Sequence, residues 1–172
     1  MTEDLTREVF FHFHLFFQTI KEVRMSFTRS VHHIVFSTKR RKPYLREDIH
    51  SDLFSYIGGI VRKRNSMLME AGGVEDHVHL LVSVHQSVAL ADLVRDIKSG
   101  SSRWIHDEHP GISGFSWQTK YGAFSVSCSM EEKVRQYILG QKEHHRKKTF
   151  QEEFRSLLDH HGFSYDERYM WE

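Results

Sequence analysis

The stretch GVEDHVHLLV, residues 73–82, decides how this chain folds. It alternates and is rich in β-branched residues, a pattern that predicts a strand whose apolar side chains enter a core. Residues i and i+2 of a strand share one face and lie roughly 7 Å apart along the chain. His77 and His79 therefore project from the same face, where two imidazoles can share a metal ion. Val78 points into the packing layer on the other face.

The segments around this strand predict an α+β fold. Strands are expected at 29–38, 67–72, 74–84, 115–118 and 123–127, and helices at 46–64, 88–105, 130–147 and 150–160. Gly72-Gly73 suits a tight turn, and Ser87 and Ser129 are expected N-caps. This order is the split βαβ pattern of ferredoxin-like or RRM-like folds, an antiparallel sheet with helices packed on one face. The helix that carries Tyr137 is expected near the C-terminal side.

Length and local character suggest how the 172 residues divide. Residues 25–160 are expected to form the main domain, and residues 161–172 an irregular tail. Residues 1–24 differ in character and form an N-terminal extension. They are either an additional helix docked on the domain or the product of a start codon placed too far upstream. The second interpretation is favoured, with Met25 as the true beginning.

The charges are unevenly spread although the net charge is only +1. Basic clusters lie at 39–42, 62–64 and 146–148, and together they can line one polyanion-binding face. Solvated side chains at element ends explain any single cluster equally well. Cys128, the only cysteine, excludes an intrachain disulfide and favours a reducing compartment. The apolar stretch Val9–Ile20 is too short to cross a bilayer, so we expect a cytoplasmic protein without membrane contact.

The helix predicted at 130–147 carries an unusual polar stripe. Tyr137 and Gln141 share one face, and His144 follows one turn later as a possible auxiliary group. Taken alone, Tyr137 is more often a half-buried packing residue and Gln141 a solvated one. The stripe gains meaning only together with the strand that carries the two histidines.

Taken together, these segments resemble a known family. The run DHVHLL at 76–81 is similar to the histidine–hydrophobic–histidine (HUH) motif of single-tyrosine transposases. The pair WQ at 117–118, the run YGAFSVS at 121–127 and the segment 137–148 resemble the insertion-sequence-200-like kind, including REP-associated tyrosine transposases. The similarity covers about residues 25–160 in the same order. An isolated HxH is weak evidence for this family in a chain with 14 histidines, whereas the combination of these motifs is specific evidence.

The resemblance implies a role for each matching residue. His77 and His79 match the two metal-binding histidines, and Gln141 matches the third ligand. Tyr137 matches the nucleophile. Two nitrogens and one amide oxygen, with positions left for phosphate and water, suit Mg²⁺ or Mn²⁺.

The resemblance also implies an activity and partners. The protein is expected to cut and join single-stranded DNA at hairpin-marked element ends, through a 5′-phosphotyrosine intermediate that conserves the bond energy. A homodimer with exchanged tyrosine helices is expected. For the DNA backbone we expect contacts from Arg40, Arg41 and Lys42 after the first strand, and from Lys98 and Arg103 on the second helix.

Two other functions remain open at this point. One is a non-catalytic or domesticated single-strand nucleic-acid-binding module, which has no need of the complete set of His77, His79, Tyr137 and Gln141. The other is a metallohydrolase that uses water as its nucleophile.

Overall fold

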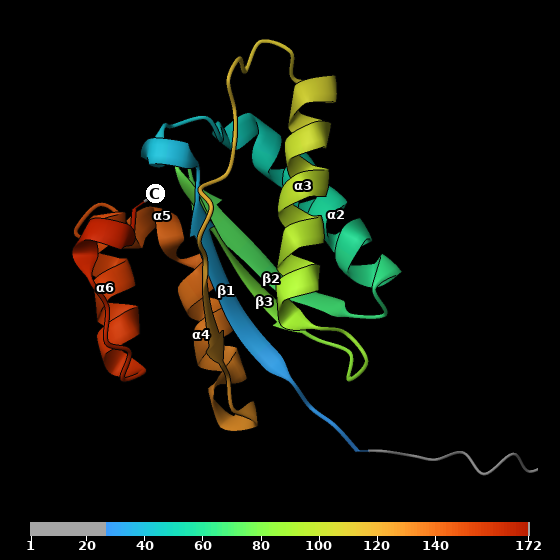
Figure 1. Ribbon diagram of the computed structural model, residues 1–172, viewed down its shortest axis with the longest axis vertical. Helices are drawn as coiled ribbons and strands as arrows, with labels where there is room; N and C mark the ends of the chain where they lie inside the picture. The colour runs from blue at the N-terminus through green and yellow to red at the C-terminus, as the bar shows by residue number, and fades with distance from the viewer. Residues whose placement is uncertain (1–26, 172) are drawn as a thin grey trace, which may run out of the picture.

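The computed structural model describes residues 27–171 (Figure 1). The main elements are β1 Val31–Ser37, α2 Glu47–Lys63, β2 Met67–Val74, β3 His77–Ser83, α3 Leu90–Glu108, β4 Gly122–Ser125, α4 Glu131–Leu139, α5 Gln141–His144 and α6 Phe150–His160, with short 3-10 turns η1 Lys39–Arg41, η2 Cys128–Met130 and η3 Glu167–Tyr169. No helix in this part of the chain is both long and apolar enough to cross a lipid bilayer. The extension predicted at residues 1–24 lies outside the described residues.

The four strands form one antiparallel sheet in the order β2-β3-β1-β4. This order confirms the predicted α+β, ferredoxin-like sheet. The strand predicted at 115–118 is reduced to an isolated bridge between Thr38 and Trp117. The histidine-bearing strand lies in the middle of the sheet, so its backbone is paired on both sides and held rigidly.

Both faces of the sheet are covered. Ile34 and Phe36 of β1 and Val78 of β3 enter the main core, against α2 and α3. These two helices cover one face as expected. The helices α4, α5 and α6 lie on the opposite face (Figure 1), which was predicted to carry no helices. The reason is that the alternate residues are apolar too: Val35 packs against the aromatic residues of α6, and Leu81 against Ile138 of α4.

Gly72 and Gly73 lie within β2 rather than in the predicted turn, which instead occupies residues 75–76. A Cβ atom at Gly72 would overlap the carbonyl oxygen of Ile138. The missing side chain therefore lets α4 lie directly on the strand. This close approach sets the position of the tyrosine-bearing helix over the sheet.

The helix predicted at 130–147 is broken. Gly140 separates α4 from α5, and residues 145–148 form turns and a bend. Neither predicted serine cap is used, because the Ser87 hydroxyl bonds to His85 and the Ser129 hydroxyl to Ser127. The helices begin later, at Leu90 and Glu131.

Candidate metal centre and nucleophile

His77 and His79 project from the same face of β3, as predicted, and both are fully buried. Their ring centroids lie 5.1 Å apart. The face they share is the one covered by α4 and α6. The two imidazoles are thus held under a helical layer and not exposed on an open sheet.

Neighbouring groups fix the orientation of both rings. Nδ1 of His77 donates to Oδ1 of Asp76 at 2.6 Å, and Nδ1 of His79 shares a hydrogen bond of 2.9 Å with Nε2 of His33. A ring whose Nδ1 carries the proton presents a lone pair at Nε2. Within residues 27–171, neither Nε2 atom has a hydrogen-bond partner. Such buried, unsatisfied nitrogens held by outer partners fit the requirements of a metal centre.

A carboxylate from α6 lies opposite these nitrogens. Oε2 of Glu153 is 3.7 Å from Nε2 of His77, 3.4 Å from Nε2 of His79 and 3.1 Å from Nε2 of His145. One ligand atom from each of these four residues lies within 4.8 Å of the others. Burial raises the pKa of Glu153, but the nearby imidazoles of His145 and His79 outweigh it and hold the pKa well below its ordinary value. The cluster therefore contains an anion able to bind a cation.

Tyr137 reaches the same carboxylate from α4. Its hydroxyl donates a hydrogen bond to Oε1 of Glu153, and its ring centroid lies 5.9 Å from that of His79. Burial and the negative charge of Glu153 raise the pKa of the Tyr137 phenol above its ordinary value. The phenol is therefore protonated in this state, beside the two histidines.

Gln141 is buried in the same cluster. Its Nε2 donates to Oε1 of Glu153 at 3.2 Å, and its Oε1 lies 2.9 Å from Nε2 of His145. The structure thus brings the predicted nucleophile and all three predicted ligands into one cluster, although the role of Gln141 as a ligand stays a prediction. His144 lies at the edge of the cluster, 3.6 Å from Oε1 of Glu153.

The expected DNA contacts separate into two groups. Arg40, Arg41 and Lys42 lie in and after η1, directly beyond Thr38. The backbone N–H of Thr38 donates to the carbonyl of Asp76, so these basic residues lie at the histidine end of the sheet. Lys98 and Arg103 lie on α3, across the sheet from Tyr137.

Lys98 already has a structural task. Its ammonium donates to the carbonyl oxygens of Gln118, Thr119 and Lys120, and burial lowers its pKa to about 8. These bonds fix the loop before β4. Arg40, Arg41, Lys42 and the exposed Arg103 stay proposed DNA contacts.

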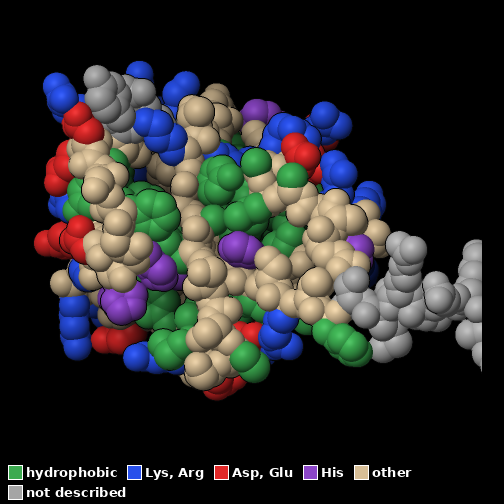
Figure 2. Space-filling view, turned by 60° about the horizontal axis from the view of Figure 1, so that its bottom comes forward, with side chains coloured by type: hydrophobic (Ala, Val, Ile, Leu, Met, Phe, Trp, Pro, Cys, Tyr) green, Lys and Arg blue, Asp and Glu red, His purple; other side chains and the backbone are tan. Residues whose placement is uncertain are grey.

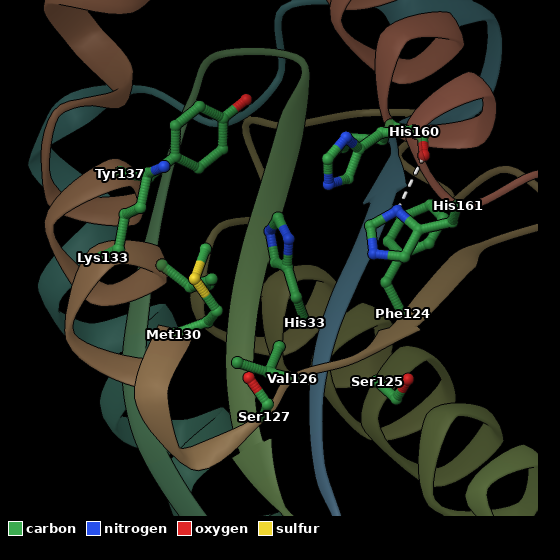
Figure 3. Close-up of a pocket in the computed structure, with 12 residues that line it drawn as sticks. His33, Phe124, Ser125, Val126, Ser127, Met130, Lys133, Tyr137, His160 and His161 are labelled. Atoms are coloured by element: carbon green, nitrogen blue, oxygen red, sulfur yellow. Dashed lines mark hydrogen bonds between the residues drawn. The ribbon is translucent and has the colours of Figure 1, made fainter.

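A cavity of about 460 Å³ opens beside the Tyr137 ring, between β4, α4 and α6. Figure 3 shows His33 at its centre, with Tyr137 on one side and His160 and His161 on the other. Figure 2 shows one face of the molecule on which hydrophobic side chains and histidines gather, with Lys and Arg mainly at the edges. The cavity thus reaches the Tyr137 ring beside the histidine cluster.

Sequence reasoning missed three members of the cluster. Sequence analysis assigned no role to His33, although the alternation of β1 places it on the face of Val35. Glu153 lies between Phe150 and Phe154 on the buried side of α6, and a carboxylate on an apolar stripe was the available signal. For His145 the sequence contains no local signal, because the helix break at Gly140 determines where this side chain lies.

Comparison with known proteins identifies the family. The family model described as "Transposase IS200 like" matches residues 26–141. The ISDra2 transposase TnpA of Deinococcus radiodurans is 24% identical over 115 residues, which is 64% of this chain and 82% of that protein.

Two solved structures share the fold. A chain from Deinococcus radiodurans R1, described as a transposase, matches with a TM-score of 0.56 and 24% identity, over 71% of this chain and 98% of that one. A REP-associated tyrosine transposase bound to a REP hairpin matches with a TM-score of 0.52 and 14% identity, over 70% and 72%. With the family model matching most of the chain, this protein belongs to the IS200-like transposase family.

Proposed function

We propose that this chain is a metal-dependent strand transferase that cuts and rejoins single-stranded DNA through Tyr137. One observation carries the proposal: the half-buried phenol of Tyr137 is hydrogen-bonded to the same carboxylate that faces the Nε2 atoms of His77 and His79. A phosphodiester transfer needs a nucleophile and a cation site, and here the Glu153 carboxylate joins the two.

The proposed reaction is a transesterification. The Tyr137 phenol loses its proton as its oxygen attacks the scissile phosphorus, the bond from phosphorus to O3′ breaks, and the released O3′ takes up one proton. A 5′-phosphotyrosine remains, so another 3′-hydroxyl can reverse the step without ATP. A divalent ion held by His77 and His79 would draw charge from the phosphate, which is worth several kcal/mol at the transition state.

The proposed substrate is single-stranded DNA that carries a hairpin near the cleavage site. The cavity beside Tyr137 is large enough for an unstacked nucleotide, and stacking on ring faces tolerates any base. Arg40, Arg41 and Lys42 lie at the histidine end of the sheet, where they would meet the backbone. One structural neighbour is described as bound to a REP hairpin, which supports hairpin DNA as the substrate. We place this reaction in the cytoplasm.

A labelled oligonucleotide tests the proposal. Hairpin oligonucleotides from a broad panel, incubated with the protein and Mn²⁺, should give a covalent adduct that is lost in Tyr137→Phe and in His77→Ala. Tyr44→Phe is the matched control, because that hydroxyl bonds to the Gly114 carbonyl away from the cluster. Turnover that survives Tyr137→Phe would favour a water-dependent hydrolase, and binding without any adduct would favour a non-catalytic module.

A homodimer remains part of the proposal, since excision cuts two ends and each chain has one Tyr137. The contact of Tyr137 with Glu153 of its own chain favours a site completed within one chain over an exchanged helix. Mixing Tyr137→Phe chains with His79→Ala chains tests this choice. Restored cleavage would show that helices are exchanged between subunits.

A further inference from the structure

We propose that His145 and Glu153 bind the divalent ion together with His77 and His79, so that the centre has three imidazoles and one carboxylate. Gln141 then positions these ligands and is not itself one. This inference rests on the metal-dependent function proposed above. Both added residues lie beyond the segment 26–141 that matches the family model.

His145 is oriented as the other two histidines are. Its Nδ1 donates to the Lys148 carbonyl oxygen at 2.8 Å, so its Nε2 side points inward. Its ring centroid lies 4.4 Å from that of His77. Three rings from two separate segments thus direct their Nε2 atoms at one point, each with an acceptor or ring partner on Nδ1.

Glu153 completes the set with suitable spacing. Adjacent ligand atoms with bonds of about 2.1 Å lie about 3.0 Å apart around an octahedral ion, which keeps positions for phosphate and water, and about 3.4 Å apart around a tetrahedral one. The observed separations from Oε2 of Glu153 to the three Nε2 atoms are 3.7, 3.4 and 3.1 Å. This oxygen is buried and has no hydrogen-bond partner within the described chain. A buried oxygen acceptor and three nitrogens that surround one position are the arrangement that binds a central cation.

Gln141 has both polar atoms engaged elsewhere. Its Nε2 donates to Oε1 of Glu153 at 3.2 Å and to the backbone oxygen of Tyr137 at 3.4 Å. Its Oε1 is within 2.9 Å of Nε2 of His145. Metal binding would replace this last contact, while the bond to Oε1 of Glu153 would keep the other carboxylate oxygen directed at the ion.

The donor set predicts the class of metal. Imidazole nitrogens suit Mn²⁺, Fe²⁺, Co²⁺ and Zn²⁺, whereas Mg²⁺ prefers oxygen ligands and retains its water. A centre with three nitrogens and one carboxylate should therefore bind Mn²⁺ at least about tenfold more tightly than Mg²⁺. Two nitrogens and an amide oxygen would discriminate less.

The test is metal binding by the full chain without DNA. Calorimetry with Mn²⁺ should show that Glu153→Gln and His145→Ala each weaken binding by at least about a hundredfold, more than the loss of an outer partner does. Glu108→Gln is the control for charge, because Glu108 is exposed at the end of α3. Circular dichroism in EDTA confirms that each variant is folded.

Pulsed EPR of bound Mn²⁺ separates ligands from positioning residues. Nitrogen couplings should fit three imidazoles in the wild type and in Gln141→Ala, and two in His145→Ala. Couplings from two imidazoles in the wild type, unchanged in His145→Ala, would overturn the inference, as would full Mn²⁺ affinity in a folded Glu153→Gln. Because no DNA is present, these outcomes are independent of whether Tyr137 forms an adduct.

Discussion

The hydroxyl of Tyr137 on α4 donates a hydrogen bond to Oε1 of Glu153 on α6, sixteen residues further along the chain. The other oxygen of that carboxylate faces the Nε2 atoms of His77 and His79. One buried side chain thus connects the proposed nucleophile with the proposed metal centre. A shift of either helix would change both at once.

Replacing Tyr137 with phenylalanine should lower DNA cleavage by at least about a thousandfold, because the attacking oxygen is lost. Mn²⁺ affinity should fall far less, by no more than about tenfold, since Gln141 still donates to Oε1 of Glu153 when the phenol is gone. Cleavage is measured on end-labelled hairpin DNA and affinity by calorimetry. Normal cleavage by the variant would exclude Tyr137 as the nucleophile.

Removing the imidazole of His33 should weaken Mn²⁺ binding by about tenfold to a hundredfold, the usual effect of losing an outer partner of a metal-binding histidine. His33 holds Nδ1 of His79 at 2.9 Å and is itself buried. His32→Ala is the matched control, because that ring bonds to Ser30 instead. Equal Mn²⁺ affinity in His33→Ala and His32→Ala would show that the His33–His79 bond has no part in the centre.

Acid should destabilise the metal-free protein. Burial lowers the pKa of His79 to about 4 and that of His33 to about 3, against an ordinary value of 6.5. In the unfolded chain both rings take up protons near pH 6.5, and in the folded chain they resist until much lower pH. Their contribution to the free energy of unfolding is therefore full above pH 6.5 and falls as pH drops towards 4, by up to about 1.4 kcal/mol per pH unit for each ring.

Urea denaturation in EDTA at pH 7 and pH 5 measures this loss. In His33→Gln one of the two rings is gone, so the free energy of unfolding should depend less steeply on pH than in the wild type. An equal pH dependence in the two proteins would show that His33 titrates normally in the fold.

A methyl group at Gly72 should lower both stability and cleavage. It would overlap the Ile138 carbonyl and push α4, with Tyr137, away from β2, at a cost of about 1–3 kcal/mol in the free energy of unfolding. Gly59→Ala is the control: it lies within α2 with no atom near the new methyl group, and it should raise stability by about 0.5–1 kcal/mol. Unchanged stability in Gly72→Ala would mean that the helix does not depend on this close approach.

The sequence predicted those features that local patterns determine. Alternation along residues 73–82 put His77 and His79 on one face and Val78 on the other, as the structure confirms. The order of strands and helices predicted the antiparallel sheet. These features depend on residue spacing within a segment, so one segment at a time suffices to find them.

Contacts between distant segments were not predicted. The helix break at Gly140 and the passage of α6 over the sheet bring His145 and Glu153 to the histidines, and no local pattern measures that approach. The apolar character of Val35 and Leu81 indicated a second covered face only in retrospect. The resemblance supplied Gln141, whereas the carboxylate beside it came from the structure.

Tandem mass spectrometry of the protein after reaction with a hairpin oligonucleotide and Mn²⁺ tests the central claim most directly. We predict a 5′-phosphorylated DNA fragment attached to the peptide that contains Tyr137, at that residue's side chain. Cleaved DNA with no attached peptide, or with the fragment on a different residue, would contradict the proposal that Tyr137 is the nucleophile.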